Sequence, residues 1–329
     1  GIKDINGNFS TVSYLYDIYD RNYKVSEPYF GTNPSQWNET QYDVYGRTNK
    51  NISYTGKTVT MGYSGLTTMV NDGTKTKSST KNAIGNVVAM TDTPGGTYTY
   101  NLFGETTSET TPNGTTTYTF DTVGKLTKKT INGTNTNSES TYVYDTATKL
   151  LASSVFKDIL EGNATTNNTF EYDSYKRLFK TIETTSYATF TKQFTFDPFG
   201  RTDKETSTAV VLANGKTSAK TIKNTYKNGS PWQILDDATS QPLWQTNTTN
   251  ARGQLTTASM GNGNIALSNT YDTYGFATQI KHDRIGMSPG NVMIINTVFD
   301  PQKGNLTSRT NSSFNWNESF QYDSLDRLT

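Results

Sequence analysis

Aromatic and polar positions alternate along most of this chain. In the clearest example, the run from Gln193 to Phe196, two phenylalanines alternate with a glutamine and a threonine. A period of two indicates a β-strand with one packed face. No segment combines a helical period with capping residues, and Val155–Leu160, which comes nearest, is too short. The pattern therefore predicts an all-β protein.

A turn signal follows this strand. Asp197, Pro198 and Gly200 suit the first, second and fourth positions of a type I β-turn. Aspartate accepts hydrogen bonds from the backbone two residues on, proline fixes φ at about −65°, and glycine relieves the last position of steric restriction. Another Thr- and Lys-rich extended run follows Arg201, so the unit is predicted to be a β-hairpin.

Copies of this unit recur from end to end. The aromatic positions at residues 100, 120, 144, 172 and 196 are 20, 24, 28 and 24 residues apart. Periods of about 20–50 residues mark a repeat architecture. The residues predicted to build the repeat turns are Tyr16, Asp17, Tyr42, Asp43, Gly46, Arg47, Tyr100, Gly104, Phe120, Asp121, Gly124, Tyr144, Asp145, Tyr172, Asp173, Phe196, Asp197, Gly200, Arg201, Tyr271, Asp272, Gly275, Phe299, Asp300, Gly304, Tyr322 and Asp323.

Four Asn-Gly steps fall between the copies. Such dipeptides favour tight turns, so we expect them at the other end of each hairpin, where loops of variable length absorb the variable period. Residues 1–329 are thus predicted to form a single continuous repeat domain, with the aromatic face on the inner or packed side of a long sheet. The four steps are Asn113-Gly114, Asn132-Gly133, Asn214-Gly215 and Asn228-Gly229.

Composition narrows the classes of function. Only 32% of the residues are hydrophobic, which would suit disorder, but the 12% aromatic content argues for an ordered chain. A formal charge of +1 without a basic block gives no electrostatic footprint for nucleic acid. No run approaches the roughly 18 apolar residues of a transmembrane helix, and the absence of cysteine excludes disulfides and thiolate metal sites.

The recurring Tyr/Phe-Asp-x-x-Gly-Arg/Lys-Leu-Thr signature resembles the YD repeat of the Rhs, teneurin and insecticidal Tc-toxin families. Tyr42–Thr48, Phe120–Thr127 and Phe196–Thr202 carry it most clearly, and the resemblance extends from Tyr16 to Thr329. It implies a spiral of β-hairpins wound into a hollow shell or barrel. In bacterial relatives this shell encloses a C-terminal toxin, and in teneurins it forms part of an adhesion ectodomain.

The chain departs from the fuller family pattern. The shell-closing core and the self-cleavage motif of bacterial Rhs proteins are absent. Phe196–Gly200 and Phe299–Gly304 contain Asp-Pro inside ordinary repeats, so the autoprotease aspartates are not carried over to them. No toxin domain is visible. Because the chain starts at Gly1 without Met or a signal peptide and stops at Thr329 inside a repeat, we expect a fragment that depends on flanking sequence.

No candidate catalytic motif outweighs its structural explanation. His282 is the only histidine, and nothing marks a nucleophile or a zinc ligand to accompany it. Gly62–Gly65 falls short of a Gly-x-Ser-x-Gly elbow. Gly261–Ala266 matches Gly-x-Gly-x-x-Ala without a strand-to-helix unit, so it is predicted to be a hairpin turn. The Asn-x-Ser/Thr strings are expected by chance in a chain so rich in Asn and Thr, so we do not interpret them as glycosylation sites.

Asp236-Asp237, near Trp232 and Trp244, could bind calcium or a sugar, but a solvated turn explains the pair better because calcium needs about six to eight oxygens. Most repeat tyrosines are likewise expected to pack across strands rather than to bind carbohydrate.

The sequence therefore favours a non-catalytic structural segment of a secreted bacterial Rhs-type shell, without cofactor or metal. Its expected partner is a C-terminal effector or toxin domain of the same parent chain, or secretion machinery. The alternative is a cell-surface adhesin or carbohydrate-binding module that recognises glycans or cell-surface proteins. Both hypotheses place the protein outside the bacterial cell or on its surface.

Overall fold

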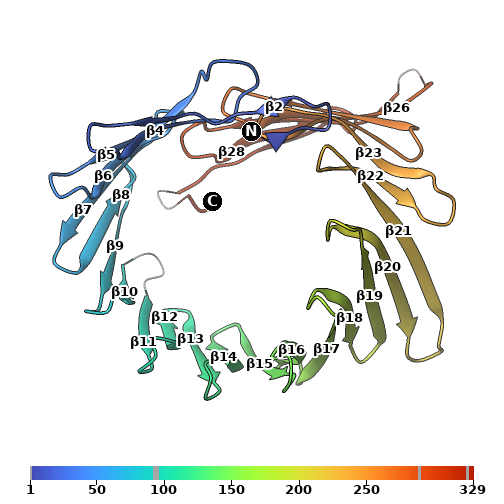
Figure 1. Cartoon of the computed structure of the whole chain (residues 1–329), viewed down its shortest axis with the longest axis horizontal. Coiled ribbons are helices and arrows are strands. Elements are labelled where there is room, and N and C mark those ends of the chain that lie inside the picture. Colours follow the sequence, from blue (N-terminus) through green and yellow to red (C-terminus); the bar gives the residue numbers. More distant parts are fainter. Residues whose placement is uncertain (1, 92–95, 288–289, 324–325) are drawn as a thin grey trace. The chain divides into compact units, whose positions relative to one another are not determined.

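A computed structural model of the chain describes residues 2–91, 96–287, 290–323 and 326–329. The described residues form β-strands and turns and no helix (Figure 1). A sheet of 27 strands, β3 to β29, runs through the chain as one antiparallel series of hairpins. The all-β prediction is thus confirmed, whereas closure of the sheet into a barrel stays a prediction.

The chain divides into two compact units, and each is described here by itself. The first unit comprises Gly1–Gly62, Val70–Thr76 and Asn224–Thr329, and the second comprises Tyr63–Met69 and Lys77–Lys223. Four strands, β7, β8, β9 and β21, contain residues of both units. The single continuous domain stays a prediction.

The strands before β15 are β1 (Ile2–Lys3), β2 (Phe9–Ser10), β3 (Tyr14–Tyr16), β4 (Asn22–Ser26), β5 (Trp37–Tyr42), β6 (Thr48–Ile52), β7 (Thr58–Ser64), β8 (Thr67–Asn71), β9 (Thr76–Lys81), β10 (Val87–Met90), β11 (Gly96–Tyr100), β12 (Thr106–Thr111), β13 (Gly114–Phe120) and β14 (Leu126–Gly133). The later strands are β15 (Asn137–Tyr144), β16 (Leu151–Asp158), β17 (Ala164–Tyr172), β18 (Leu178–Thr184), β19 (Ala188–Phe196), β20 (Thr202–Val211), β21 (Thr217–Lys227), β22 (Ser230–Asp236), β23 (Pro242–Thr249), β24 (Leu255–Met260), β25 (Ile265–Tyr271), β26 (Ala277–Arg284), β27 (Asn291–Phe299), β28 (Leu306–Asn311) and β29 (Trp316–Ser319).

The repeat turn is a compact hydrogen-bonded unit, seen clearly between β19 and β20. Gly200 N donates to Asp197 O at 2.9 Å, which closes the turn. Asp197 Oδ1 accepts from the backbone N–H groups of Phe199 and Arg201, both at 2.9 Å. Arg201 Nε then donates to Asp197 Oδ2 at 2.8 Å. The aspartate therefore binds both the turn backbone and the arginine that follows the turn.

The fourth turn position requires a left-handed backbone. Gly200 has φ +78°, and Gly46, Gly104, Gly124 and Gly275 are similar. Where a copy lacks the glycine, another residue adopts this conformation. Asp20, Lys176 and Asp326 do so at the fourth position, and Lys149 does so at the fifth position of a turn that is one residue longer; their φ values lie between 58° and 63°.

Exchanging residues at this turn position is expected to change stability in opposite directions. Lys176→Gly should raise the free energy of unfolding by up to about 1 kcal/mol, and Gly200→Ala should lower it by about 1 kcal/mol, because only glycine adopts this φ without strain. A Cβ at residue 200 would lie 3.6 Å from Arg177 Nη1, an ordinary contact, so the expected loss comes from the backbone. Urea unfolding measures both, and equal shifts of the same sign would contradict this explanation.

Two of the predicted Asn-Gly turns have a different structure. Asn132-Gly133 forms the end of β14: both residues pair with β13, Asn132 also pairs with β15, and residues 134–136 make the connection instead. Gly114 begins β13, which leaves Pro112 and Asn113 in the turn. The neighbouring strands extend pairing over these dipeptides and override their turn preference. By contrast, Asn228-Gly229 connects β21 to β22. Its φ values of +51° and +85° are both positive, as a two-residue type I′ hairpin turn requires.

The repeat aromatic joins one hairpin to the previous one. The Tyr144 hydroxyl donates to Leu126 O at 3.0 Å, and the Tyr271 hydroxyl donates to Leu255 O at 2.8 Å. In each case the acceptor is the fifth residue after the Asp or Asn that begins the preceding turn. The same bond recurs from Tyr42 to Asn22, from Tyr100 to Val87 and from Tyr322 to Leu306.

We expect Tyr144→Phe to lower the free energy of unfolding by about 1 kcal/mol, because the carbonyl of Leu126 would lose its hydroxyl donor. Tyr187→Phe is the matched control, since Tyr187 is 81% exposed and its hydroxyl can bond to water. Thermal or urea unfolding of both variants measures the difference. Equal losses in the two variants would show that the hydroxyl bond does not join the repeats.

The basic residue after the turn also reaches the next repeat. The Arg177 guanidinium lies 4.1 Å from the ring centroid of Phe196, and Lys125 Nζ lies 4.6 Å from that of Tyr144. Such cation–π contacts contribute roughly 0.5–1 kcal/mol at exposed sites. The consensus residues therefore connect neighbouring hairpins as well as closing each turn.

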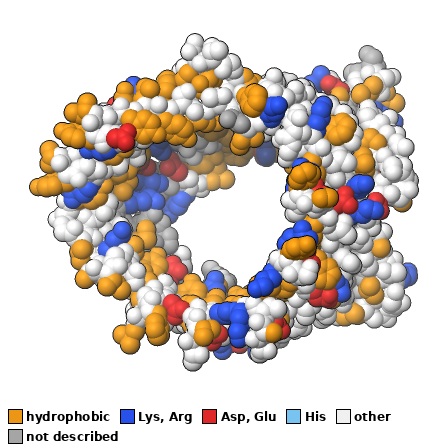
Figure 2. Space-filling view, viewed as in Figure 1, with side chains coloured by type: hydrophobic (Ala, Val, Ile, Leu, Met, Phe, Trp, Pro, Cys, Tyr) orange, Lys and Arg blue, Asp and Glu red, His pale blue; other side chains and the backbone are white. Residues whose placement is uncertain are grey.

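Few side chains are fully removed from solvent. Ile5, Ala258 and Leu267 are the buried hydrophobic residues in the described part of the chain, and hydrophobic side chains reach the surface along the strands and turns (Figure 2). The repeat aromatics are half-buried, except Tyr16, which is 55% exposed. Cross-strand and inter-repeat contacts, rather than a deep core, thus stabilise this sheet.

Candidate functional site

Successive turns of an antiparallel series alternate between two edges of the sheet. We call the edge that carries turns 17–20, 43–46, 250–253 and 272–275, together with Asp323 and Asp326, the Asp edge. The other, which carries loops 27–36, 53–56, 72–75, 261–264 and 312–315, is the far edge. The candidate functional feature of the first unit is a contact between these two edges.

The beginning of the chain lies against the Asp edge of its last third. Asn228 Nδ2 donates to Asp4 O at 3.2 Å, and Ser10 Oγ donates to Ala251 O at 2.6 Å. Farther along, Lys75 Nζ lies 3.4 Å from Asp326 Oδ2. All these partners belong to the first unit and are more than 220 residues apart in sequence. We call this line of contacts the seam.

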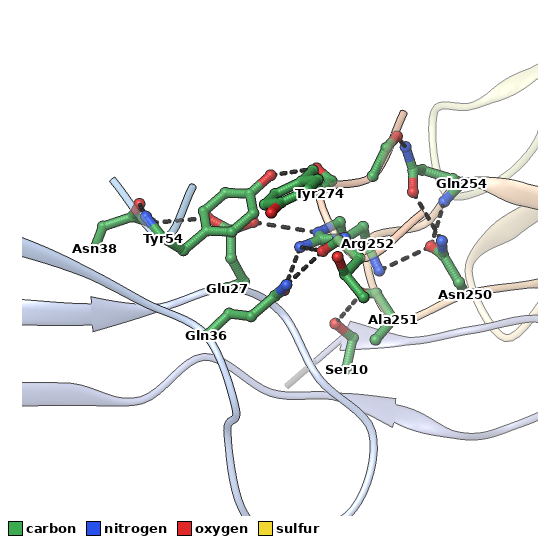
Figure 3. Close-up of polar contacts among 12 residues, drawn as sticks. Ser10, Glu27, Gln36, Asn38, Tyr54, Asn250, Ala251, Arg252, Gln254 and Tyr274 are labelled. Atoms are coloured by element: carbon green, nitrogen blue, oxygen red, sulfur yellow. Dashed lines mark hydrogen bonds and ion pairs between the residues drawn. The ribbon is translucent and has the colours of Figure 1, made fainter. Parts of the chain in front are cut away.

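Arg252 is the centre of the seam (Figure 3). Its Nε lies 3.3 Å from Glu27 Oε2, and both side chains are about one-fifth exposed. Its Nη2 donates to Gln36 Oε1 and to Thr273 O. The guanidinium also lies 5.2 Å from the ring centroid of Tyr54. One arginine from an Asp-edge turn therefore binds two far-edge loops, 27–36 and 53–56.

Two tyrosines complete this cluster. The rings of Tyr54 and Tyr274 stack with centroids 6.4 Å apart, and the Tyr54 hydroxyl donates to Tyr274 O. Burial raises the pKa of the Tyr54 hydroxyl above its ordinary value, although the charge of Arg252 acts in the opposite direction. The hydroxyl therefore stays a neutral donor at physiological pH.

Neighbouring amides hold these groups in place. Asn38 Nδ2 donates to Glu27 Oε1 at 2.8 Å, while Asn38 Oδ1 accepts from Tyr54 N at 3.0 Å. On the other side, Gln254 Nε2 donates to Gly275 O at 2.8 Å and connects two Asp-edge turns (Figure 3). The cluster is thus a preorganised binding contact in which charged and amide groups are paired across the two edges.

A cavity of 670 Å³ lies beside the cluster in the first unit. Its lining is largely apolar and includes Ile5, Trp244 and Leu255, and Arg252 also lines it. Trp244 Nε1 donates to Thr246 Oγ1 at 3.2 Å. A cavity of this size and lining has the dimensions of a small-molecule site.

The sequence does not predict the cluster around Arg252. The structure puts the repeat aromatics at strand ends, apart from Tyr322, which forms an isolated bridge with Leu328, and it puts the repeat aspartates in the turns; residues 324–325 of the last copy lie outside the described residues. One feature of the sequence does distinguish Arg252 from the other repeat arginines. In the copy at 250–256, arginine occupies the third turn position instead of following the glycine. Gln254 replaces it there and pairs with Asn250 at 2.8 Å, which leaves Arg252 to cross the seam.

The other candidate groups lie in ordinary sheet positions. His282 is in the middle of β26, between β25 and β27. Gly261–Asn264 forms the hairpin turn into β25, as predicted, and Ile265 and Ala266 begin that strand. Asp236 Oδ1 accepts from Ala238 N at 3.0 Å, in a turn-capping role.

The described residues lack two further features. No group of three or more His, Cys, Asp or Glu side chains among them could hold a metal ion. Nor does this part of the chain contain a helix with the length and apolarity to span a membrane.

Comparison with known proteins shows a fold likeness. The sequence matches no family model and no curated protein. The structure resembles TcdB2–TccC3–Cdc42 with a TM-score of 0.60 and 14% identity, over 96% of this chain and 21% of that chain. It resembles TcdB2–TccC3 with a TM-score of 0.58 and 15% identity, over 97% and 21%. A mutant Photorhabdus luminescens Tc holotoxin pore gives 0.58 and 14%, over 96% and 20%.

At these identities the likeness establishes the fold alone. It agrees with the resemblance of the repeat signature to the Tc-toxin families. This chain spans about a fifth of the length of the chains that it matches.

Proposed function

We propose that this chain is a non-catalytic structural segment of a secreted bacterial Rhs-type shell, which encloses or presents a C-terminal effector of the same parent chain. The seam is the observation that carries this proposal. The seam joins segments that lie more than 200 residues apart in sequence, through Arg252, Tyr54 and their partners. A contact of this kind would hold successive layers of hairpins together in one wall. The Tc-toxin-like fold supports the same role.

The mechanism is sequestration. Backbone hydrogen bonds join each strand to the next, and the inter-repeat tyrosine bonds reinforce those pairs. A continuous hydrogen-bonded sheet excludes solvent and partners from the space behind it. The seam supplies the pairing between layers that strand pairing alone does not give.

Intact-mass measurement of the natural full-length product tests this function. We expect a C-terminal effector that co-purifies under native conditions and that denaturant frees from the sheet. A full-length product that has no further domain beyond the repeats would contradict the proposal. Hydrolase screening with a His282→Ala control should show no activity that depends on this side chain.

A second candidate is the adhesin, because the cavity beside Trp244 could hold an apolar face of a sugar. A glycan-array signal that Trp244→Ala removes and Trp316→Ala retains would favour it. Loss of signal in both variants, or no signal from the unsubstituted chain, would leave the shell as the better explanation.

A further inference from the structure

The opening segment of the chain is a separate structure laid on the first unit. Its strands β1 and β2 pair with each other in a two-stranded sheet of their own, outside the sheet of 27 strands. Ser230 Oγ donates to Lys3 O at 3.4 Å, and Asn228 Nδ2 donates to Ile5 O at 3.3 Å. We call residues 2–12 the cover, because side chains of the sheet hold its backbone.

The 670 Å³ cavity is bounded by the cover and by the sheet that the cover lies on. Its lining combines Ile2, Ile5 and Val12 of the cover with Trp244 and Leu255 of β23 and β24. Cavities of roughly 300–1,000 Å³ with mainly apolar walls are typical of small-molecule sites. The space therefore has the size and the walls of a ligand site that two separately formed structures enclose.

The charged groups of the lining leave no charge for a ligand to compensate. Asp4 Oδ1 accepts two backbone N–H groups of its own turn, at 2.9 and 2.7 Å. Arg252 is paired with Glu27, and Lys3 is exposed, with its Nζ 4.9 Å from the ring centroid of Phe9. Burial of a charge without a partner is costly. The cavity thus favours a neutral ligand.

A polypeptide segment fits this lining poorly. Each of its residues would bring backbone N–H and C=O groups that need partners when they are buried. The hydroxyl groups of Ser10, Ser230 and Thr246 in the lining already take part in hydrogen bonds within the chain. Buried water also needs about two to four polar partners. A compact apolar molecule has neither requirement.

We propose that this cavity binds a neutral, mainly apolar small molecule with a flat ring that lies against Trp244. The indole Nε1 donates to Thr246 Oγ1 at 3.2 Å, which orients the ring. Removal of apolar surface from water drives the binding, and ring–ring contact adds to it. The site requires neither an effector nor a closed shell, so it is independent of the proposed function.

Fluorescence titration with N-phenylnaphthylamine, a neutral probe that brightens in apolar surroundings, tests the proposal. We expect saturable one-to-one binding that naphthalenemethanol displaces and the charged naphthoate does not. Leu255→Trp fills the cavity and should weaken binding at least about tenfold. Leu243→Trp is the matched control, because Leu243 is 40% exposed and does not line the cavity, and it should bind like the unchanged chain. Circular dichroism and the thermal midpoint verify that both variants remain folded.

Asn228→Gly tests the part that the cover plays. Asn228 has φ +51°, which glycine adopts without strain, so this variant removes the bonds to the cover and keeps the turn. It should weaken binding about threefold or more, and an unchanged affinity would mean that the cover does not form part of the site.

Three other results would overturn the proposal. They are the absence of saturable binding, an unchanged affinity in Leu255→Trp, and displacement by naphthoate as efficient as by the alcohol. The titration is repeated on the natural full-length product, where the same affinity is expected. Binding by residues 1–329 that the full-length product lacks would show that another part of the parent chain fills the cavity, and would equally overturn the proposal.

Discussion

Replacing Arg252 with methionine is expected to give the largest loss of stability of any single substitution in the seam, about 2–4 kcal/mol. Methionine retains much of the side-chain volume but leaves Glu27 and Gln36 without their cationic partner at a position where both members of the ion pair are about one-fifth exposed. It also removes the cation from the ring of Tyr54. Urea unfolding followed by tryptophan fluorescence measures the loss.

Arg47→Met is the matched control for this substitution. Arg47 pairs with Asp43 inside its own turn and is 46% exposed, so solvent screens the pair and the expected loss stays below about 1 kcal/mol. Amide hydrogen exchange should also increase in loop 27–36 of the Arg252 variant alone. If both variants lose the same stability, Arg252 does not act across the seam.

Acidification below pH 4 is expected to destabilise the protein through its repeat turns. The pKa of the Asp17 carboxyl is lowered mainly by its bond to Arg21. For Asp197, partial burial raises the pKa, but hydrogen bonds from the Arg201 backbone and side chain outweigh this effect, so the net pKa is lowered. The carboxyls with a lowered pKa in this group of turns are Asp17, Asp43, Asp121, Asp145, Asp173 and Asp197.

The sign of the effect follows from these directions. Each folded-state pKa lies below the ordinary aspartate value of 3.8, so the unfolded chain binds protons first as the pH falls. The stabilisation is complete above the unfolded-state pKa and is lost as the pH falls through the folded-state values. We therefore expect the urea midpoint to be nearly constant from pH 7 to 5 and to fall increasingly below pH 4.

Asp173→Asn/Asp197→Asn provides the control. Asparagine already begins the turn at Asn101, where its Oδ1 accepts from the backbone N–H groups of Phe103 and Glu105. The double variant should therefore keep its turns and show a smaller decrease of the urea midpoint between pH 5 and 3. A pH profile identical to that of the unchanged chain would mean that these carboxyls do not cause the acid sensitivity.

The repeat turns could be predicted because their physics is local. Asp197 and Gly200 lie three residues apart, and the hydrogen bonds that join them depend only on the turn between them. The alternation before the turn also appears in the structure, where Phe194 and Phe196 are half-buried while Gln193 and Thr195 are exposed. A single sequence contains all that these features require.

Features that depend on distant residues could not be predicted in this way. Asn132-Gly133 has the residues of a turn, yet pairing with β13 and β15 keeps it extended. Arg252 differs from other repeat arginines by a shift within its turn, but the sequence does not indicate that its partner lies at Glu27, 225 residues away. The sequence periodicity predicts the hairpins. The contacts of the seam depend on residues more than 200 positions apart in the sequence, which the periodicity does not identify.

Cross-linking across the seam tests the central claim most directly. The chain has no cysteine, so Asn6→Cys/Asn247→Cys introduces the only thiols, at positions where Asn6 Nδ2 lies 3.3 Å from Asn247 O. A short bifunctional thiol reagent should join the two peptides within one chain at dilute concentration, and urea should abolish the product. The single-cysteine variants measure cross-linking between chains. Efficient labelling of both thiols without an internal cross-link would contradict the edge-to-edge seam.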